Sequence, residues 1–300
     1  LVGMVALFTK GLTLGVDFKG GRSYVVSFNE AIPPTQLKIG LTEYFDNQGT
    51  EVKTFGADNI VKVTTSYMID DVSDEADIKV KEALIKGLTE SAKLTYNSSD
   101  GEPGAGEFII SSSSKVGATI ADDIKNSSYE SAIFALICIF LYILIRFRKW
   151  QFGLGAIVAL FHDTLFVISA FAIVGLFGVV YEVDQVFVAA ILTIIGYSIN
   201  DTVVVFDRIR ENLGIKSGSE MVKVFNESLN GTISRTMITS LTTLIVVIIL
   251  FLFGGAVLKG FSFALLVGIT VGTYSSIFIA TPTVLDFYRK RDSKAKAVSA

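Results

Sequence analysis

One acidic residue, Asp201, lies inside an apolar stretch (183–206) that is long enough to cross a lipid bilayer. A carboxylate at the centre of a spanning helix costs about 2.5–3.5 kcal/mol to insert. Such a residue usually faces a protein or water interior, where it handles ions or protons. The sequence therefore makes Asp201 the first candidate for function, as a group that takes up and releases a cation.

Polar residues accompany Asp201 on its own stretch. Thr193 and Tyr197 precede it at intervals of four, which places all three on one face of a helix. Asn200 is its immediate neighbour. We therefore predict that Tyr197 and Asn200 belong to the same proton pathway as Asp201.

The next apolar stretch supplies a cation, Arg235, on one face with Thr239 and Thr242. Counted from the ends of the two stretches, Asp201 and Arg235 lie at similar depth. Their pairing would make a proton site, because protonation of the acid releases the arginine and the change of charge can move a helix. The alternatives are a static ion pair that fixes helix packing, or an arginine that only anchors its helix at the membrane surface.

A second polar site is predicted at His162 and Asp163, near the middle of another apolar stretch. The two residues could relay protons or lock helices together. They could equally be a pair that neighbouring backbone and hydroxyl groups satisfy. Carboxylate chemistry also permits Na⁺ in place of the proton.

A glycine-rich segment, Gly15 to Gly21, does not have the spacing of a nucleotide-binding loop. Its glycines, Gly20 and Gly21 among them, are expected to form a turn where the chain leaves the membrane and enters a strand. Asp17 and Lys19 are expected to help dock the following domain on the membrane helices.

Composition places the chain among membrane proteins. It has 300 residues, of which 51% are hydrophobic, and a mean hydropathy of +0.56. The single Cys138 excludes an internal disulfide, and the single His162 argues against a multi-histidine zinc site or a hydrolase triad. No basic footprint for nucleic acid is present. No cofactor and no enzymatic activity are expected.

Five stretches are predicted to span the membrane, at 128–146, 152–180, 183–206, 233–253 and 261–285, the last broken by Gly268, Gly272 and Pro282. The Lys and Arg residues gather in alternate connections, after 146, after 206 and after 288. The positive-inside rule places those connections in the cytoplasm. We therefore assign 127–288 to a five-helix membrane domain and 289–300 to a basic cytoplasmic tail.

Residues 11–126 are polar and carry more Asp and Glu than Lys and Arg. Strand patterns at 22–28, 51–55, 59–65 and 107–112 alternate with two helical patterns, the first after Pro33 and Pro34 and the second from Val80 to Ala92. This order predicts a ferredoxin-like α+β domain with both helices on one face of a sheet, outside the membrane. The apolar residues 1–10 are expected to be the end of a first membrane helix that begins upstream.

Three motifs together resemble the SecD/SecF family of auxiliary membrane subunits of bacterial protein export. They are the segment from Gly15 to Gly21, the segment from Ala159 to Thr164, and a long segment from Gly196 to Asn212 that is very similar to the SecF signature. Ser234 to Thr236 is similar to the SecF segment that follows. The resemblance covers nearly the whole chain.

The resemblance implies one six-helix half of an RND-type bundle, paired with a SecD half that is either separate or fused. It implies use of the proton-motive force to promote late-stage translocation of unfolded polypeptide across the cytoplasmic (inner) membrane, with SecYEG as the channel and SecA and YajC as indirect partners. Asp201 matches the family's intramembrane carboxylate and Arg235 its partner arginine. The second acid of that pathway belongs to SecD.

Two other functions fit the same charges. A proton-coupled exporter of small molecules or lipids would share them, but it should have a larger outer domain than about 115 residues. A purely structural subunit would use its charges for packing only, and neutral substitutions would then reduce its abundance rather than its activity.

Overall fold

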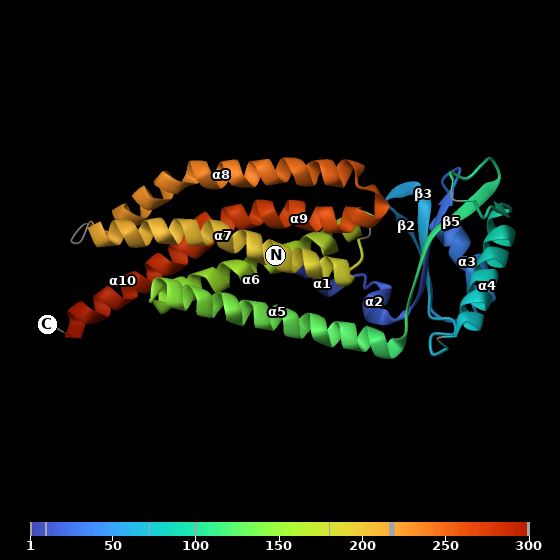
Figure 1. The fold of residues 1–300 in the computed structure, drawn as a ribbon, viewed down its shortest axis with the longest axis horizontal. Coiled ribbons are helices and arrows are strands. Elements are labelled where there is room, and N and C mark those ends of the chain that lie inside the picture. The colour runs from blue at the N-terminus through green and yellow to red at the C-terminus, as the bar shows by residue number, and fades with distance from the viewer. Residues whose placement is uncertain are drawn as a thin grey trace.

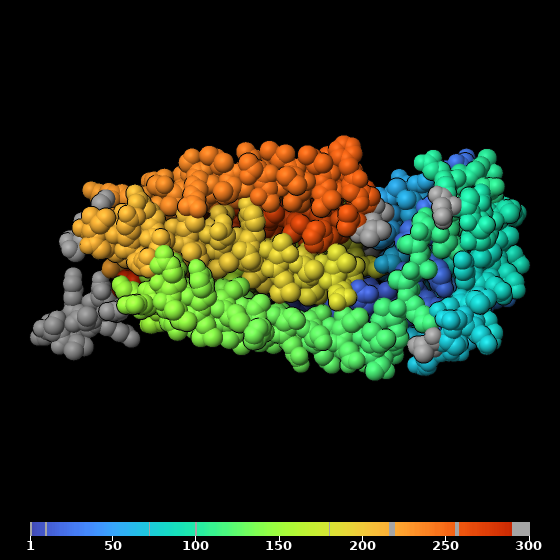
Figure 2. Space-filling view, in the orientation of Figure 1, coloured from blue at the N-terminus to red at the C-terminus, as the bar shows by residue number. Residues whose placement is uncertain are grey.

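The computed structural model describes residues 2–9, 11–71, 73–99, 101–179, 181–215 and 220–298. It consists of a long helical bundle with a sheet domain at one end (Figure 1). The C-terminal helix reaches the opposite end, which we call the far end of the bundle. In the space-filling view, the sheet domain covers the other end of the bundle, which we call the near end (Figure 2).

The sheet domain contains five strands in the order β2-β3-β1-β5-β4. All neighbouring strands are antiparallel except β4 and β5. Without the two-residue β4, the strand order is that of the predicted ferredoxin-like fold, which is confirmed. The strands are β1 (Gly21–Phe28), β2 (Thr50–Phe55), β3 (Ala57–Thr65), β4 (Thr95–Tyr96) and β5 (Glu107–Val116).

Two helices cover the face of the sheet that points away from the bundle (Figure 1). Helix α3 (Pro34–Tyr44) begins with proline at its first position, where a missing N–H costs nothing. Helix α4 (Asp74–Ala92) is capped by the Ser73 hydroxyl, which accepts from the N–H of Ala76. Apolar side chains at helical spacing pack on alternating strand residues, and the largest members of this core are fully buried: Phe28, Leu37, Leu41, Phe45, Leu84, Leu88 and Phe108.

The described part of the bundle has five helices long and apolar enough to cross a membrane, as predicted. The last of them combines α9, a π-helical segment η1 and the start of α10. All the helical elements of the bundle and of its junction with the sheet domain, including the short ones, are α1 (Val2–Thr9), α2 (Val16–Lys19), α5 (Ala118–Phe147), α6 (Trp150–Leu176), α7 (Gln185–Ile215), α8 (Met221–Phe253), α9 (Gly255–Ser275), η1 (Ser276–Ala280) and α10 (Thr281–Val298).

Several helices extend beyond their apolar stretches. Helix α5 starts at Ala118, ten residues before the predicted span. At the far end, α7 continues past 206 to Ile215, and α8 already begins at Met221, before 233. Composition marks only the part of a helix that lipid or core surrounds, so it misses polar turns that continue the same helix.

The predicted breaks in the last span are only partly present. Helix α9 passes through Gly268 and Gly272 without interruption. The irregularity comes at η1, immediately before Pro282, where the hydroxyl of Thr281 donates to the carbonyl of Ser276 at 2.9 Å. Proline lacks an N–H and its ring crowds the preceding turn, and a π-helical turn accommodates both effects.

The two glycines of α9 let it approach α7 closely. A Cβ atom on Gly268 would lie 2.4 Å from Ile194, and one on Gly272 would lie 3.0 Å from Ser198. Small residues at four-residue spacing are a common way to bring membrane helices together. This close approach places hydroxyl groups of α9 next to those of α7.

The sheet domain is attached to the bundle by the connection between α6 and α7. Leu14 and Val183 form a parallel β-bridge. Lys62 of β3 pairs with Glu182 at 2.5 Å, and both side chains are largely buried. Lys259 also donates to the carbonyl of Gly56 at 2.8 Å. These contacts fix the base of the sheet to the near end of the bundle.

Candidate functional site

Asp201 lies at the middle of α7 and is 3% exposed. Its Oδ2 atom accepts a hydrogen bond from the hydroxyl of Ser240 on α8 at 3.2 Å. Ser240 in turn accepts from Thr273 on α9 at 2.6 Å. One carboxylate is therefore connected to three helices through a short chain of hydroxyl groups.

Asp201 and Arg235 form no salt bridge among the described contacts, but Arg235 lies close enough for its charge to act on Asp201. Arg235 is exposed on α8. The face of α8 that packs inward carries small hydroxyl residues at four-residue spacing: Ser228, Thr232, Thr236 and Ser240.

The register of α7 against α8 sets the separation of the two charges. Asp201 lies opposite Ser240, and Asn212 donates to Ser228 at 2.8 Å near the far end. On this register Arg235 is five residues from Ser240, or more than one helical turn toward the far end. The arginine therefore acts on Asp201 from beyond salt-bridge distance.

The other predicted companions of Asp201 divide between two faces of α7. The Tyr197 hydroxyl donates to the Thr239 carbonyl at 3.0 Å and lies 3.2 Å from the Thr243 hydroxyl. Tyr197 therefore joins the same α7–α8 interface as Asp201. Asn200 is exposed, and its side chain makes no hydrogen bond within the described part of the chain.

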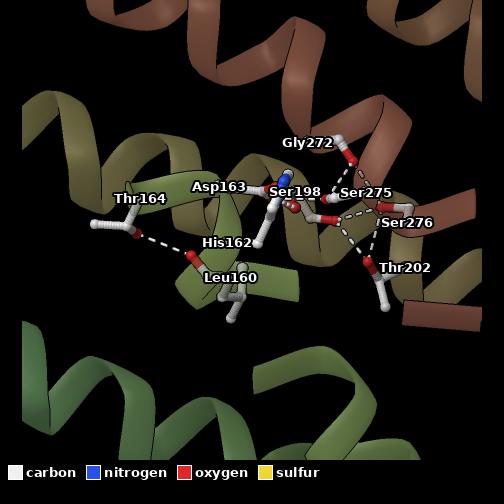
Figure 3. A network of polar contacts seen from close by, with 9 residues as sticks. All are labelled: Leu160, His162, Asp163, Thr164, Ser198, Thr202, Gly272, Ser275 and Ser276. Atoms are coloured by element: carbon white, nitrogen blue, oxygen red, sulfur yellow. Dashed lines mark hydrogen bonds and ion pairs between the residues drawn. The ribbon is translucent and has the colours of Figure 1, made fainter. Parts of the chain in front are cut away.

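The second predicted site, Asp163, is the centre of a separate polar network (Figure 3). Its Oδ2 atom accepts from Ser198 of α7 at 2.7 Å and from Ser275 of α9 at 2.8 Å. Its Oδ1 atom lies 3.1 Å from Nδ1 of His162, and Asp163 is 1% exposed. Asp163 therefore has three hydrogen-bonding partners, one on its own helix and one on each of α7 and α9.

The network continues from Ser198 along α7 and α9 (Figure 3). Thr202 donates to the Ser198 carbonyl at 3.1 Å, and its hydroxyl lies 2.8 Å from that of Ser276 in η1. Asp163 and Asp201 thus contact opposite sides of the α7–α9 pair. Sequence reasoning missed these serines and threonines. The spacing of four between Ser198 and Thr202, and again between Gly272 and Ser276, was the available signal.

The glycine-rich segment forms the junction that was expected of it. Gly20 and Gly21 have φ values of 72° and 118°, which favour glycine, and a Cβ on Gly21 would lie 2.6 Å from the Thr65 carbonyl oxygen. Asp17 accepts from the N–H of Gln185 at 2.9 Å, at the start of α7. Lys19 instead pairs with Glu51 of β2, at 3.8 Å.

A buried arginine of the sheet domain was not predicted. Arg22 is 3% exposed and donates to Asp77 at 2.7 Å and to the carbonyls of Met68 and Asp71. Burial raises the pKa of Asp77, but hydrogen bonds from Lys115 and Arg22 outweigh it and leave the pKa below its usual value. An arginine at the start of a strand gives no sign in the sequence that a loop will close over it.

The carboxylate and hydroxyl groups of these sites can exchange protons or bind hard cations. Among the described residues, no three His, Cys, Asp or Glu side chains come together in a group that could hold a metal ion. Both buried carboxylates are surrounded by hydroxyl groups, which can donate or accept as the charge of the acid changes.

Two family models match the chain. One describes the C-terminal part of the protein-export membrane proteins SecD and SecF and covers residues 101–290. The other describes the SecD/SecF GG motif and covers residues 5–32. The second match includes Gly20 and Gly21, and the first includes both buried carboxylates.

Curated relatives match over nearly the full length. The protein translocase subunit SecF of Rhodothermus marinus is 42% identical, over 100% of this chain and 91% of the relative. That of Vibrio alginolyticus is 39% identical, over 93% of this chain and 81% of the relative.

Solved structures of SecDF share the architecture. The crystal structure of SecDF from Thermus thermophilus, described as a translocon-associated membrane protein, matches with a TM-score of 0.77 and 30% identity. A SecDF structure in the super-membrane-facing form matches with a TM-score of 0.64. The alignments cover 96% and 99% of this chain but 36% and 37% of the solved chains, so this chain spans about a third of each. By sequence, family match and fold, the chain belongs to the SecF family of protein translocase subunits.

Proposed function

We propose that the chain works with a SecD partner as a membrane subunit of the protein-export translocase and uses the proton-motive force to promote late steps of polypeptide passage. The observation that carries this proposal is Asp201, a buried carboxylate at the middle of a membrane helix with a hydroxyl group as its hydrogen-bond donor. No described cation forms a salt bridge with it, although the charge of Arg235 acts on it from a greater distance. A carboxylate in that setting can exist with or without its proton.

Protonation of Asp201 would reverse a hydrogen bond. The ionised acid can only accept, so Ser240 donates to it, whereas the protonated acid can itself donate to Ser240. Because Ser240 also accepts a hydrogen bond from Thr273, the reversal would alter the hydrogen bonds that join α7, α8 and α9. Each elementary charge that crosses 100 mV supplies about 2.3 kcal/mol, which is enough to bias a conformational equilibrium of a few kcal/mol.

Arg235 has a place in this proposal near that which the sequence suggested. It is exposed on α8, and its charge acts on Asp201 although the two side chains form no salt bridge. An exposed arginine on one half of a two-part bundle can also meet an acid of the other half. We therefore assign it a position between Asp201 and the surface that faces SecD.

The proposed orientation follows from the distribution of basic residues. Arg146, Arg208 and Arg210 lie at the far end of the bundle, where Arg146 and Arg210 both pair with Asp207. The positive-inside rule then places the far end in the cytoplasm and the sheet domain outside. SecYEG would lie beside the bundle, and SecA and YajC would act on the cytoplasmic side or indirectly.

The proposal is tested by export into inverted membrane vesicles that contain the complete translocase. Asp201→Asn keeps the size of the side chain and removes the exchangeable charge. We expect it to abolish the part of export that depends on the proton-motive force and to leave the part driven by ATP alone. Collapse of the Na⁺ gradient should have no effect if the proton is the coupling ion.

Glu211→Gln is a matched control, because this residue lies on the same helix, is exposed and, within the described part of the chain, forms a salt bridge only with Arg208. It should export like the wild type. Full proton-dependent export by Asp201→Asn would refute the proposal. Loss of protein from the membrane, with normal export per molecule, would instead show a structural role for Asp201.

A further inference from the structure

The outer edge of β5 is open over most of its length. Strand β4 pairs with β5 only at Thr95–Glu107 and Tyr96–Phe108. Beyond that point the chain turns away, because the side chain of Asn97 donates to Glu107 at 2.7 Å and accepts from the N–H of Ser99 at 2.9 Å. Within the described residues, no strand continues beside 109–114.

The register shows which backbone groups face this open edge. The Phe108 carbonyl accepts from the N–H of Asn97, so the backbone polar groups of Phe108 point away from β1. Phe108 lies opposite Phe28, and Tyr24, four residues earlier on β1, lies opposite Ser113. A β-bulge opposite Val25 leaves Ser111 without a register partner on β1, so five residues of β5 lie opposite four of β1. Counted along the regular strand β1, Ser113 is in the same phase as Phe108, and its N–H and C=O also point outward.

A groove lies beside this edge, between β5 and α4. It has a volume of about 260 Å³ and is lined by Tyr24, Ile78, Lys81 and Ser113, with Arg22, Asp77 and Lys115 at its end. Ile78 is 59% exposed although it is a large apolar residue. Tyr24 and Ser113 lie directly opposite each other and so share the face of the sheet that α4 covers.

An open strand edge with a groove between strand and helix is the arrangement that binds peptides by strand addition. Main-chain hydrogen bonds hold the peptide, and alternate side chains enter the groove. We propose that the edge of β5 from Ile109 to Ser114 and its groove bind an extended segment of the translocating polypeptide. This inference rests on the proposed function for the identity of the polypeptide.

The opposite edge of the sheet is built differently. On β2, Glu51 contacts Lys53 and also pairs with Lys19. Charged residues on an edge strand discourage pairing with other chains. The open part of β5 instead carries four consecutive exposed serines, Ser111 to Ser114. An uncharged edge that binds through backbone groups suits a substrate whose sequence varies.

Peptide binding to the full chain in nanodiscs, without a proton gradient, tests the inference. The probe is a fluorescent peptide of alternating Thr and Val, and its control is the same peptide N-methylated at every second residue. Ser113→Pro removes the outward N–H, and Ser113→Ala keeps it. We expect Ser113→Pro to weaken binding about tenfold, which corresponds to about 1.4 kcal/mol, because it removes one hydrogen bond and blocks the neighbouring one. Ser113→Ala should bind like the wild type.

Two further measurements test the inference even if Ser113→Pro unfolds the sheet domain. The N-methylated peptide should bind at least about tenfold more weakly to the wild type, because methylation removes its donors. Ile78→Glu, on an exposed position of α4, should also weaken binding by placing a charge in the groove.

Equal binding of the plain and methylated peptides, or equal binding by Ser113→Pro and the wild type, would overturn the inference. So would a concentration-dependent dimer that Ser113→Pro abolishes, because the edge would then belong to a second copy of this chain. Asp201→Asn should bind the peptide normally, so a failure here leaves the proton proposal standing and the reverse is also true.

Discussion

The hydroxyl of Ser240 donates to Asp201 across the α7–α8 interface at 3.2 Å. A hydroxyl can reverse its hydrogen bond when the acid gains a proton, whereas a guanidinium can only donate. The inner lining of this bundle is therefore made of small groups that can follow a change of charge. The hydroxyl chain through Thr273 extends that response to α9.

The close approach of α9 to α7 should depend on the absence of a side chain at Gly268. Gly268→Ala would place a methyl group 2.4 Å from Ile194, and we expect a loss of about 1–3 kcal/mol of bundle stability from overpacking. Thermal unfolding in detergent measures the effect. Gly196→Ala is the control, because nothing lies within 4 Å of that position.

A second substitution gives the stricter test of that contact. Ile194→Ala should restore much of the stability lost in Gly268→Ala, because it makes room for the added methyl group. Additive losses in the double variant would show that the two residues do not press on each other.

Gly21→Ala should destabilise the junction between the membrane and the sheet domain. Its φ of 118° is unfavourable for any other residue, and the new Cβ would lie 2.6 Å from the Thr65 carbonyl oxygen. We expect a cost of about 1–3 kcal/mol, detected as faster proteolysis of the sheet domain. Gly101→Ala, in an open loop, should be cleaved like the wild type.

Acid should weaken the sheet domain through Asp77. Its folded pKa lies below the unfolded value, so its hydrogen bonds to Lys115 and Arg22 contribute stability that is complete above the unfolded pKa of 3.8 and is lost as the pH falls through the folded pKa. Unfolding of the sheet domain followed between pH 3 and 7 should therefore show less acid dependence in Asp77→Asn. Equal acid dependence of unfolding in Asp77→Asn and in the wild type would contradict this prediction. Asp58→Asn, at an exposed position, is the control.

The Lys62–Glu182 pair should hold the sheet domain on the bundle. Both partners are largely buried, so Lys62→Ala leaves an uncompensated carboxylate and should cost about 3 kcal/mol. In Lys62→Ala, spin labels on the sheet domain and on the bundle would report a broader distribution of the distance between these two parts. The exchanged pair, Lys62→Glu with Glu182→Lys, should narrow it again, and failure to do so would assign the docking to Leu14–Val183 alone.

The sequence was informative where a single residue contradicts its surroundings. Asp201 stands out because a carboxylate in an apolar stretch is costly, and Gly20 and Gly21 stand out because paired glycines mark a turn. The ferredoxin-like fold of the sheet domain was also predicted, from the order of strand and helix patterns along the chain.

Contacts that depend on the register between helices could not be predicted in this way. The pairing of Asp201 with Ser240 requires the offset between α7 and α8, and the hydrogen bonds of Asp163 require three helices to meet. Serine and threonine occur in many positions of membrane helices, so the spacing of four between Ser198 and Thr202 does not show which carboxylate these residues contact until the helices are placed. The burial of Arg22 depends in the same way on a loop that closes over it.

Proton flux through the SecD-containing complex in sealed proteoliposomes tests the central claim most directly. An imposed pH gradient should acidify the lumen through the wild type and through Glu211→Gln while a polypeptide is being translocated. Asp201→Asn should abolish that flux although the complex assembles normally. If Asp201→Asn conducts protons at the wild-type rate, Asp201 is not the proton-carrying group and the proposed coupling is wrong.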